Sequence, residues 1–254
     1  MLVFVKQILD SEAKLSIKDD GKSIDYEERF SLNFFDEFAI EEAIRIKEKW
    51  QSCEIVAVSY GPKKAQEVLR TAIAMGGDRG ILIEAQTYGI GDPGYTAKIL
   101  ATFAKNEGFD MILCGERAMD DENGIMGVLV AESLDVPYVG SVVKMEFEDE
   151  KTVTVDSEID GELLSYKVEL PAVFSLRKGI NEPRVPAITG VMKAMRAQIP
   201  SIEPTSLISA SPRTVILGYE PPPKRPAVKI IEGKTPKEKV TKLVALLKEE
   251  AKAL

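Results

Sequence analysis

Short apolar runs that alternate with amphipathic segments constrain the fold of this chain more than any other feature. Runs rich in Val, Ile and Leu indicate four buried strands: Leu2–Val5, Ile55–Val58, Ile81–Ile83 and Met111–Cys114. Helical spacing indicates helices along Ala39–Trp50 (capped by Asn33 or Asp36), Ala65–Ile73, Ile99–Ala104 and from Val128 onward. This alternation predicts an α/β fold, a doubly wound parallel sheet with helices on both faces. Ligands bind such sheets at the carboxyl ends of the strands, where the strand order switches.

The second half of the chain has a different pattern. The expected elements are a β-hairpin over Lys151–Val155 and Leu163–Leu170, a core strand over Ala172–Leu176, a proline-rich extended stretch from Lys178 and an amphipathic helix over Pro236–Leu254. We therefore divide the chain into an α/β domain, residues 1–200, and an extended arm with a C-terminal helix, residues 201–254. That helix is expected to dock on its own domain or on a partner.

Composition excludes several classes of function. The 254 residues carry a formal net charge of −8, the wrong sign for a nucleic-acid-binding protein. The chain has no histidine, which excludes histidine-dependent hydrolysis, and its two cysteines cannot form a disulfide framework or a cysteine-only zinc site. The sequence begins with no recognisable leader and has no apolar stretch long enough to span a bilayer. We expect a cytoplasmic binding or carrier protein without a metal, which meets a membrane only through its partners.

Two turns that follow expected strands are candidates for binding phosphate. Ser59-Tyr60-Gly61-Pro62 leads from a strand into a helix, where free N–H groups favour an anion, although a tight connection alone needs the same residues. Gly89-Ile-Gly91-Asp-Pro-Gly94 has the G-x-G-x-x-G spacing of dinucleotide-binding loops. Because it follows the third strand rather than the first, we interpret it as a loop that leads into a helix.

The segment from Gly115 to Gly127 combines acidic residues with a glycine-rich end. Asp120, Asp121 and Glu122 could bind magnesium, but consecutive acids before a helix more often cap its N-terminus. The glycine-rich end, with free backbone N–H groups, is better suited to cradle a phosphate. The proline-flanked turn Asn181–Pro186 is either an exposed charged turn or an interaction loop of limited flexibility.

Several segments of the chain occur in a characteristic order. They are Leu2-Val-Phe-Val-Lys6-Gln, Asn33-Phe-Phe-Asp36-Glu-Phe-Ala-Ile-Glu41-Glu-Ala, Val56-Ala-Val-Ser59-Tyr-Gly61-Pro62, Leu69-Arg-Thr-Ala-Ile-Ala-Met75-Gly76-Gly-Asp78-Arg79, Gly115-Glu-Arg-Ala118-Met-Asp120-Asp121, Glu158-Ile-Asp160-Gly161, Leu170-Pro171-Ala172-Val173 and Asn181-Glu182-Pro183-Arg184, running into Met192-Lys193-Ala194. Over almost the whole chain this order resembles the β subunit of electron transfer flavoproteins.

The resemblance implies a doubly wound core like that of flavodoxins and adenine-nucleotide hydrolases, paired with an α subunit as a heterodimer. Such heterodimers shuttle electrons through FAD between dehydrogenases, of the acyl-CoA or NADH type, and a downstream acceptor. The electron-carrying FAD lies mainly on the α subunit. The β subunit holds a second nucleotide, which is AMP in ordinary carriers and a second FAD in the electron-bifurcating branch.

The resemblance also implies which residues bind. By motif position, the nucleotide contacts are Phe4, Asn33, Phe34, Phe35, Asp36, Tyr60, Gly61, Asp92, Thr96, Gly115, Glu116, Arg117, Ala118, Met119, Asp120, Asp121, Glu122, Asn123, Gly124, Ile125 and Met126. Partner contacts are implied at Arg184 and Ile188, in a recognition loop that docks on dehydrogenases. A further one is implied at Leu164, where many members have an acid that faces the flavin domain.

Departures from the family pattern bear on the nucleotide. Ordinary members have Asn-Gln-Thr where this chain has Gly124, Ile125 and Met126, so three side-chain donors to a terminal phosphate are lost. Asp92 and Thr96 partly match a bifurcating-type motif. These features favour a second FAD over AMP.

Two other interpretations stay open. The chain could be a stand-alone adenine-nucleotide-binding or hydrolysing α/β protein, with Asp120, Asp121 or Glu122 as the base. It could also be a structural partner whose nucleotide only fills a core cavity. ATP turnover by the purified chain would support the first, and electron transfer unaffected by nucleotide removal would support the second.

Overall fold

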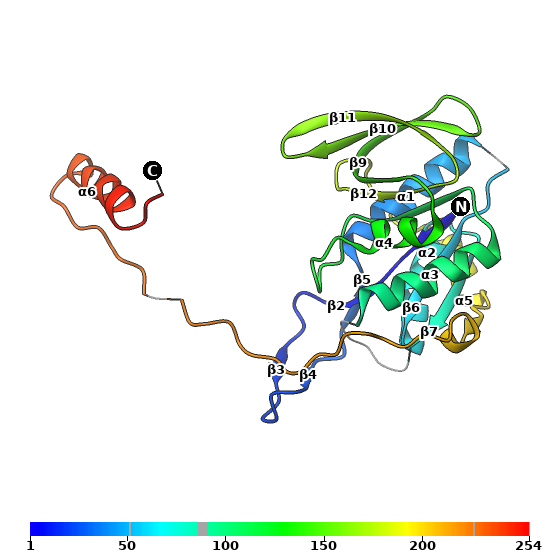
Figure 1. Ribbon diagram of the computed structural model, residues 1–254, viewed down its shortest axis with the longest axis horizontal. Helices are drawn as coiled ribbons and strands as arrows, with labels where there is room; N and C mark the ends of the chain where they lie inside the picture. Colours follow the sequence, from blue (N-terminus) through cyan, green and yellow to red (C-terminus); the bar gives the residue numbers. More distant parts are fainter. Residues whose placement is uncertain (51, 86–90, 226, 254) are drawn as a thin grey trace.

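The computed structural model describes residues 1–50, 52–85, 91–225 and 227–253. A nine-stranded sheet forms the core (Figure 1). Its strands are β1 (Leu2–Phe4), β6 (Val56–Gly61), β7 (Arg79–Glu84), β8 (Met111–Gly115), β9 (Tyr138–Phe147), β10 (Thr152–Ile159), β11 (Glu162–Glu169), β12 (Ala172–Leu176) and β13 (Ser201–Ile202). They lie in the order β11-β10-β9-β12-β8-β1-β6-β7-β13, and all pair in parallel except β10 with β9 and β11. The predicted α/β fold is confirmed, and β9 and β13 are strands that sequence reasoning missed.

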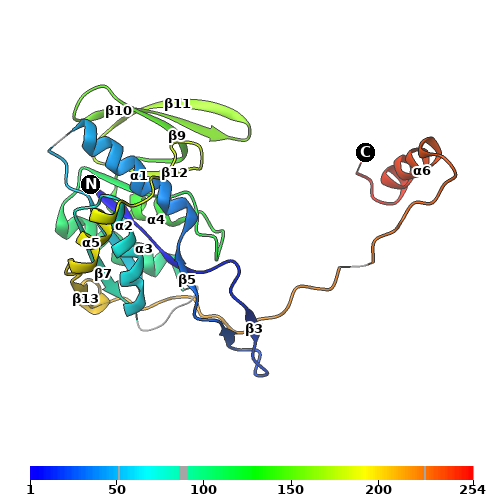
Figure 2. The same cartoon turned by 180° about the vertical axis from the view of Figure 1, so that it is seen from behind.

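Helices cover both faces of this sheet, as predicted (Figure 2). The α-helices are α1 (Phe34–Lys49), α2 (Gln66–Met75), α3 (Pro93–Glu107), α4 (Met126–Leu134), α5 (Ile188–Arg196) and α6 (Pro236–Glu249). Along β1, Val3 packs with the apolar side chains of α1 and α2, whereas Leu2 and Phe4 pack with those of α3 and α4. Successive strand side chains point to opposite faces, so a strand covered on both faces must be apolar throughout.

The order of the strands defines where a ligand can enter. From β1 the chain adds β6 and β7 on one side, and it then crosses over to add β8 on the other side of β1. The strand order therefore switches at β1, and the loops after β1, β6 and β8 diverge at one edge of the sheet. Such a divergence leaves a crevice at the carboxyl ends of the strands.

The predicted β-hairpin extends the sheet beyond its parallel part. Strands β10 and β11 pair along their whole length, from Thr152 opposite Glu169 to Ile159 opposite Glu162. The turn residues Asp160 and Gly161 both have positive φ, 52° and 81°, which is the geometry of a two-residue hairpin turn. The hairpin and the core strand β12 are confirmed.

Two small antiparallel pairs lie between β1 and α1. Strand β2 (Gln7–Leu9) pairs with β5 (Phe30–Leu32), and β3 (Leu15–Ile17) pairs with β4 (Ile24–Tyr26). These three-residue strands were not predicted, because runs so short carry no measurable periodicity.

The prediction of an extended chain from Lys178 onward is wrong for α5. This helix packs so closely on α2 that a Cβ on Gly190 would overlap the carbonyl oxygen of Ala74. The Nη1 of Arg70 on α2 donates to the carbonyl oxygens of Ala194 (2.5 Å) and Ala197 (3.1 Å), at the C-terminal end of α5. Contacts with α2 therefore stabilise a helix that its proline-rich surroundings conceal.

The first part of the arm, beyond residue 200, still contacts the α/β domain. After β13 comes a 3₁₀ turn over Pro204–Ser206, and Ile202, Leu207 and Ile208 pack against the core cluster that includes α3. Residues 209–225 and 227–235 contain no helix or strand. Arg213, Thr214 and Tyr219 still form hydrogen bonds with the domain, and the later part of the arm leads away from it to α6 (Figure 1). The predicted C-terminal helix is confirmed, although it ends at Glu249, and Leu254 lies outside the described residues.

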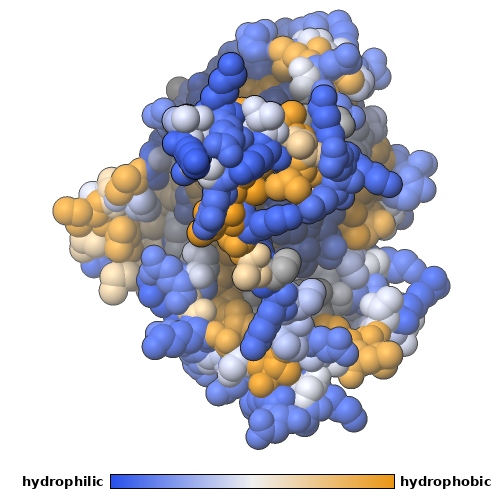
Figure 3. All heavy atoms as spheres, turned by 90° about the vertical axis from the view of Figure 1, so that its left-hand side faces the viewer, coloured by the Kyte–Doolittle hydropathy of each residue, from blue (hydrophilic) through white to orange (hydrophobic). Residues whose placement is uncertain are grey.

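Helix α6 carries an apolar stripe that the domain does not cover. Thr235 caps it by accepting a hydrogen bond from the backbone N–H of Glu238 (3.2 Å), and no described residue of α6 is buried. Val240, Leu243 and Val244 are among the exposed large apolar residues. Figure 3 looks at the molecule from the side on which α6 lies and shows apolar side chains rimmed by hydrophilic ones.

Candidate functional site

A cavity of about 470 Å³ opens at the carboxyl ends of β1, β6 and β8. This is the edge where the strand order switches, and the volume is typical of small-molecule pockets, roughly 300–1,000 Å³. The predicted residues that line it are Phe4, Asn33, Asp36, Tyr60, Gly61, Thr96, Gly115, Glu116, Arg117, Ala118, Asp121, Asn123, Gly124, Ile125 and Met126. Loops that are far apart in the sequence therefore meet around one cavity.

Asp36, in the first turn of α1, joins three segments at this cavity. It is only 5% exposed. Its Oδ2 accepts a hydrogen bond from the Lys6 backbone N–H (2.7 Å), and its Oδ1 accepts from the Asn33 amide (2.9 Å) and the Gly115 backbone N–H (3.2 Å). Burial raises the pKa of Asp36 to about 7, and these hydrogen bonds oppose that rise. The carboxyl group thereby fixes the ends of β1 and β8 relative to α1.

Asn33 and Lys6 hold the loop of residues 116–124 at the cavity. The Asn33 amide nitrogen donates to the carbonyl oxygen of Arg117 (2.9 Å), and its Oδ1 accepts from the Met119 backbone N–H (3.1 Å). The Nζ of Lys6 pairs with Asp120 (2.7 Å) and Asp121 (3.2 Å). A loop with this many contacts is pre-formed before any ligand binds.

The helix caps predicted from these residues are wrong. Asn33 occupies the N-cap position of α1, but it makes no side-chain capping bond, because its amide is engaged by the loop. The acids Asp120 and Asp121 pair with Lys6 instead of capping α4, whose N-cap residue is Ile125. These two carboxylates do not cap α4, and among the described residues no group of three or more His, Cys, Asp or Glu side chains is arranged to hold a metal ion.

Glycines allow the backbone to form the wall of the cavity. A Cβ on Gly115 would overlap Asp36 Oδ1 and lie 2.8 Å from the carbonyl carbon of Phe35. Gly124 has φ 61°, in the left-handed region, and it turns the chain into α4. The first turn of α4 has no side-chain cap, so its N–H groups and positive end can receive an anion at the cavity. The glycine-lined wall and the free N–H groups at the start of α4 together fit the phosphate of a nucleotide.

The remaining predicted nucleotide contacts lie beside the lining rather than in it. They are Phe34, Phe35, Asp92, Met119, Asp120 and Glu122, while Gly89 of the glycine motif lies outside the described residues. The Arg117 guanidinium lies 4.7 Å from the ring centre of Phe35 and pairs with Glu122 (2.8 Å). Asp92 caps α3 by accepting from the Tyr95 backbone N–H (3.0 Å). Arg117 and Tyr95 thus link some of these residues to segments at the cavity.

Sequence reasoning missed part of the lining. Pro62, Gly91 and Pro93 belong to the two candidate turns, and the missed residues are Val5, Lys6, Gln7, Val58, Ala85, Leu100, Cys114, Ile216 and Tyr219. Lys6 and Gln7 directly follow the first strand, and that position alone could have identified them. Ile216 and Tyr219 come from the arm, and no local sequence pattern connects them with the cavity.

The predicted partner residues lie away from the cavity. Ile188 begins α5 and is 80% exposed, and Leu164 is an exposed residue of β11. Arg184 makes two hydrogen bonds of 2.9 Å to the buried carboxylate of Glu41 and also pairs with Glu48 (2.6 Å). The hydrogen bonds to Glu41, followed by those to Glu48, raise the pKa of Arg184. The positive charge of Arg184 is therefore paired with carboxylates of α1.

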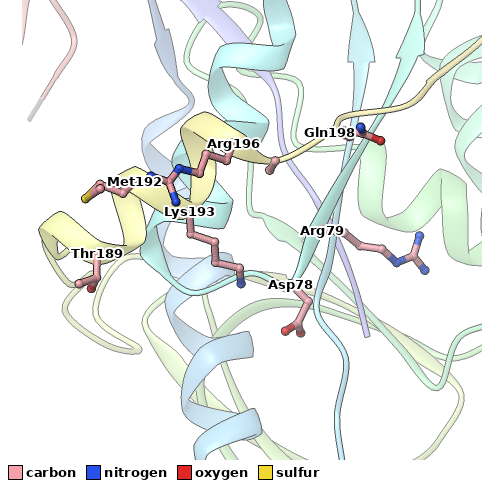
Figure 4. Close-up of a pocket in the computed structure, with 8 residues that line it drawn as sticks. Asp78, Arg79, Thr189, Met192, Lys193, Arg196 and Gln198 are labelled. Atoms are coloured by element: carbon pink, nitrogen blue, oxygen red, sulfur yellow. The ribbon is translucent and has the colours of Figure 1, made fainter.

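A second hollow, of about 670 Å³, is an open surface between α5 and the start of β7 (Figure 4). Three of its charged side chains have partners in the chain. Lys193 donates to the carbonyl oxygen of Gly77 (3.0 Å), Asp78 pairs with Lys47, and Arg79 pairs with glutamates. This hollow is larger than the cavity at β1, but it lies outside the carboxyl ends of β1, β6 and β8.

Comparison with known proteins identifies the family. A model of the electron transfer flavoprotein domain matches residues 22–207. The human electron transfer flavoprotein subunit beta is 37% identical over 98% of this chain and 96% of its own length. Its counterparts are 34% identical in Bacillus subtilis, over 100% of this chain and 99% of theirs, and 38% identical in Syntrophomonas wolfei, over 99% and 97%. In the described part of the chain, no helix has the length and apolar character to cross a membrane. The chain belongs to the electron transfer flavoprotein β-subunit family.

Proposed function

We propose that this protein pairs with an α subunit to form an electron transfer flavoprotein and binds a second FAD in the cavity at β1. The observation that carries the proposal is the uncapped N-terminus of α4, which opens into a cavity walled by Gly115 and Gly124. Backbone N–H groups at a helix N-terminus bind phosphate through both hydrogen bonds and the helix dipole. When bound, the flavin supplies the electron chemistry.

The chain's residues bind and orient this nucleotide. Asp36, Asn33 and Lys6 hold the loop of residues 116–124 in place through the contacts described above. Tyr60 and Pro62, at the end of β6, supply apolar and aromatic surface on the opposite side of the lining. A pre-formed wall of this kind reduces the entropy lost when the nucleotide binds.

The residues at the start of α4 favour FAD over AMP. A terminal phosphate is a dianion at neutral pH, and charge-assisted bonds from side chains are the strong way to hold it. Gly124, Ile125 and Met126 provide no side-chain donors. The pyrophosphate of FAD carries one charge per phosphorus, so backbone donors at a helix end suffice for it.

Electron exchange with other proteins is assigned to α5. Ile188 stands at the position of the family's recognition loop and is exposed, so we propose that it docks on a dehydrogenase. Leu164 is proposed to face the α subunit, and Arg184 to hold the recognition loop against α1. We place the complex in the cytoplasm, where it meets a membrane only through its partners.

The stand-alone hydrolase has less support. It needs a free carboxylate as base, and the two nearest candidates, Asp120 and Asp121, are paired with Lys6. ATP turnover by the purified chain would support the hydrolase interpretation.

The test is a nucleotide count on the co-purified α–β complex after denaturation. Two FAD and no AMP per complex is the expected result, whereas one FAD and one AMP would assign an ordinary carrier. A Ile125→Glu variant should lose the β-side nucleotide, because a carboxylate at this exposed lining residue repels phosphate while it suits a helix N-terminus. Val128→Glu places the same charge in the same turn outside the lining and should retain the nucleotide. Equal retention in both variants would refute the cavity assignment.

A further inference from the structure

We infer that residues 213–219 of the arm, here named the strap, form the outer wall of the nucleotide cavity and limit the rate at which the nucleotide leaves. The inference rests on the proposed nucleotide site. Ile216 and Tyr219 are lining residues that come from the arm, whereas all other lining residues belong to the α/β domain. The motifs of the domain gave no indication of them.

Two side chains of the strap line the cavity, and two others face solvent. Val215 and Leu217 are 78% and 84% exposed, while Ile216 between them is 48% exposed and lines the cavity. Tyr219 is half-buried and also lines it. Ile216 and Tyr219 are three positions apart, so the strap contacts the cavity without the strict alternation of a β-strand.

Asp92 fixes one end of the strap. Its Oδ2 accepts hydrogen bonds from the backbone N–H groups of Arg213 (2.6 Å) and Thr214 (3.1 Å), while its Oδ1 caps α3 through Tyr95. These backbone hydrogen bonds lower the pKa of Asp92, so the carboxylate is ionised and accepts at both oxygens at neutral pH. Asp92, which the sequence suggested as a nucleotide contact, is on this inference a positioning residue for the strap.

The β3–β4 hairpin fixes the other end. The Tyr219 backbone N–H donates to the carbonyl oxygen of Gly21 (2.8 Å). Gly218 allows this close approach, because a Cβ there would lie 2.9 Å from the same oxygen. Gly21 has φ 64° at the tip of the hairpin, which aims its carbonyl oxygen at the strap.

The strap is held more weakly than the opposite wall. Its described contacts are three backbone hydrogen bonds at exposed positions. The loop of residues 116–124 is held by ion pairs to Lys6 and by the buried Asn33. The wall with fewer and more exposed contacts opens at lower free energy, so the strap is the exit for the nucleotide.

The experiment measures nucleotide release from the α–β complex. Complex carrying its bound nucleotide is mixed with an excess of labelled FAD, and the original nucleotide that remains bound is followed by chromatography. Tyr219→Ala removes the aromatic part of the wall, and Asp92→Asn leaves one carbonyl oxygen where the cap and the strap need two. Both variants should release nucleotide about tenfold faster, which corresponds to roughly 1.4 kcal/mol. Leu217→Ala, which removes an outward side chain of the same segment, should match the wild type.

A second readout does not depend on the nucleotide's chemistry. Trypsin should cut after Arg213 faster in Asp92→Asn than in the wild type, because the strap is no longer held. If Tyr219→Ala and Asp92→Asn both release nucleotide at the wild-type rate while Ile125→Glu loses its nucleotide, the inference about the strap is refuted. The assignment of the nucleotide site would still hold. Full retention in Ile125→Glu would overturn the site and the strap together.

Discussion

The ion pair between Arg184 and Glu41 should contribute much more to stability than the surface pairs of the same chain. It joins the segment before Ile188 to the middle of α1. The Glu41 side chain is 6% exposed and that of Arg184 is 36% exposed, and two hydrogen bonds of 2.9 Å link them. We therefore expect a large coupling energy in a double-mutant cycle of Arg184→Met and Glu41→Gln.

The magnitude follows from burial. Removal of one partner of a fully buried pair costs about 3–5 kcal/mol, because the other charge stays buried without compensation. Water reaches the outer side of Arg184 and screens its charge, which reduces the expected cost of Arg184→Met to about 2–3 kcal/mol. The coupling between the two substitutions should be about 2 kcal/mol. Lys229 and Glu250, 64% and 62% exposed, form the control pair, and their coupling should not differ from zero.

Urea denaturation of the α–β complex, followed by circular dichroism at one protein concentration, measures these differences. The concentration must stay fixed because association contributes to apparent stability. The slope of free energy against urea should be the same in all variants, so that shifts in midpoint report stability. A coupling for Arg184 and Glu41 as small as that of the control pair would refute the reasoning.

Two further predictions concern close packing and protonation. Gly190→Ala should lower the urea midpoint by the equivalent of about 1–3 kcal/mol, because the new methyl group overlaps Ala74 where α5 packs on α2. An unchanged midpoint would show that α5 is not fixed there. For Asp36, burial raises the pKa from 3.8 to about 7, so its contribution to stability is complete below pH 3.8 and is lost as the pH rises through 7. Asp36→Asn should flatten the pH dependence of stability between about pH 4 and 8 by a few kcal/mol, and identical profiles would contradict this.

The parts of the fold that could be predicted are those whose burial leaves a long signal in the sequence. β8 and β12 are buried on both faces and therefore consist of apolar runs, and α2 carries a regular stripe. α5 left no such signal, since one face packs on α2 through Gly190 while the other is exposed and apolar. β13 consists of two residues whose strand geometry depends only on its pairing with β7.

The site, like the fold, could be predicted only in part. The loops after β6 and β8 were found because they follow strands of a doubly wound sheet, whereas Lys6 and Gln7 after β1 were missed. The partners of the charged residues were not found. Nothing in the sequence indicates that Lys6 pairs with acids more than a hundred residues away, or that Asp92 holds the strap. Such pairings depend on tertiary structure, which local propensity does not encode.

The strap and α6 belong to the same arm. A partner that bound α6 and thereby changed the hydrogen bonds at Asp92 and Gly21 would link occupancy of the cavity to assembly of the complex. By reciprocity, any factor by which that partner changes nucleotide affinity is the factor by which the nucleotide changes the partner's affinity. If binding of α6 to a partner moves the strap toward the cavity, a subunit without its nucleotide binds that partner less tightly. Assembly of the complex then depends on nucleotide binding.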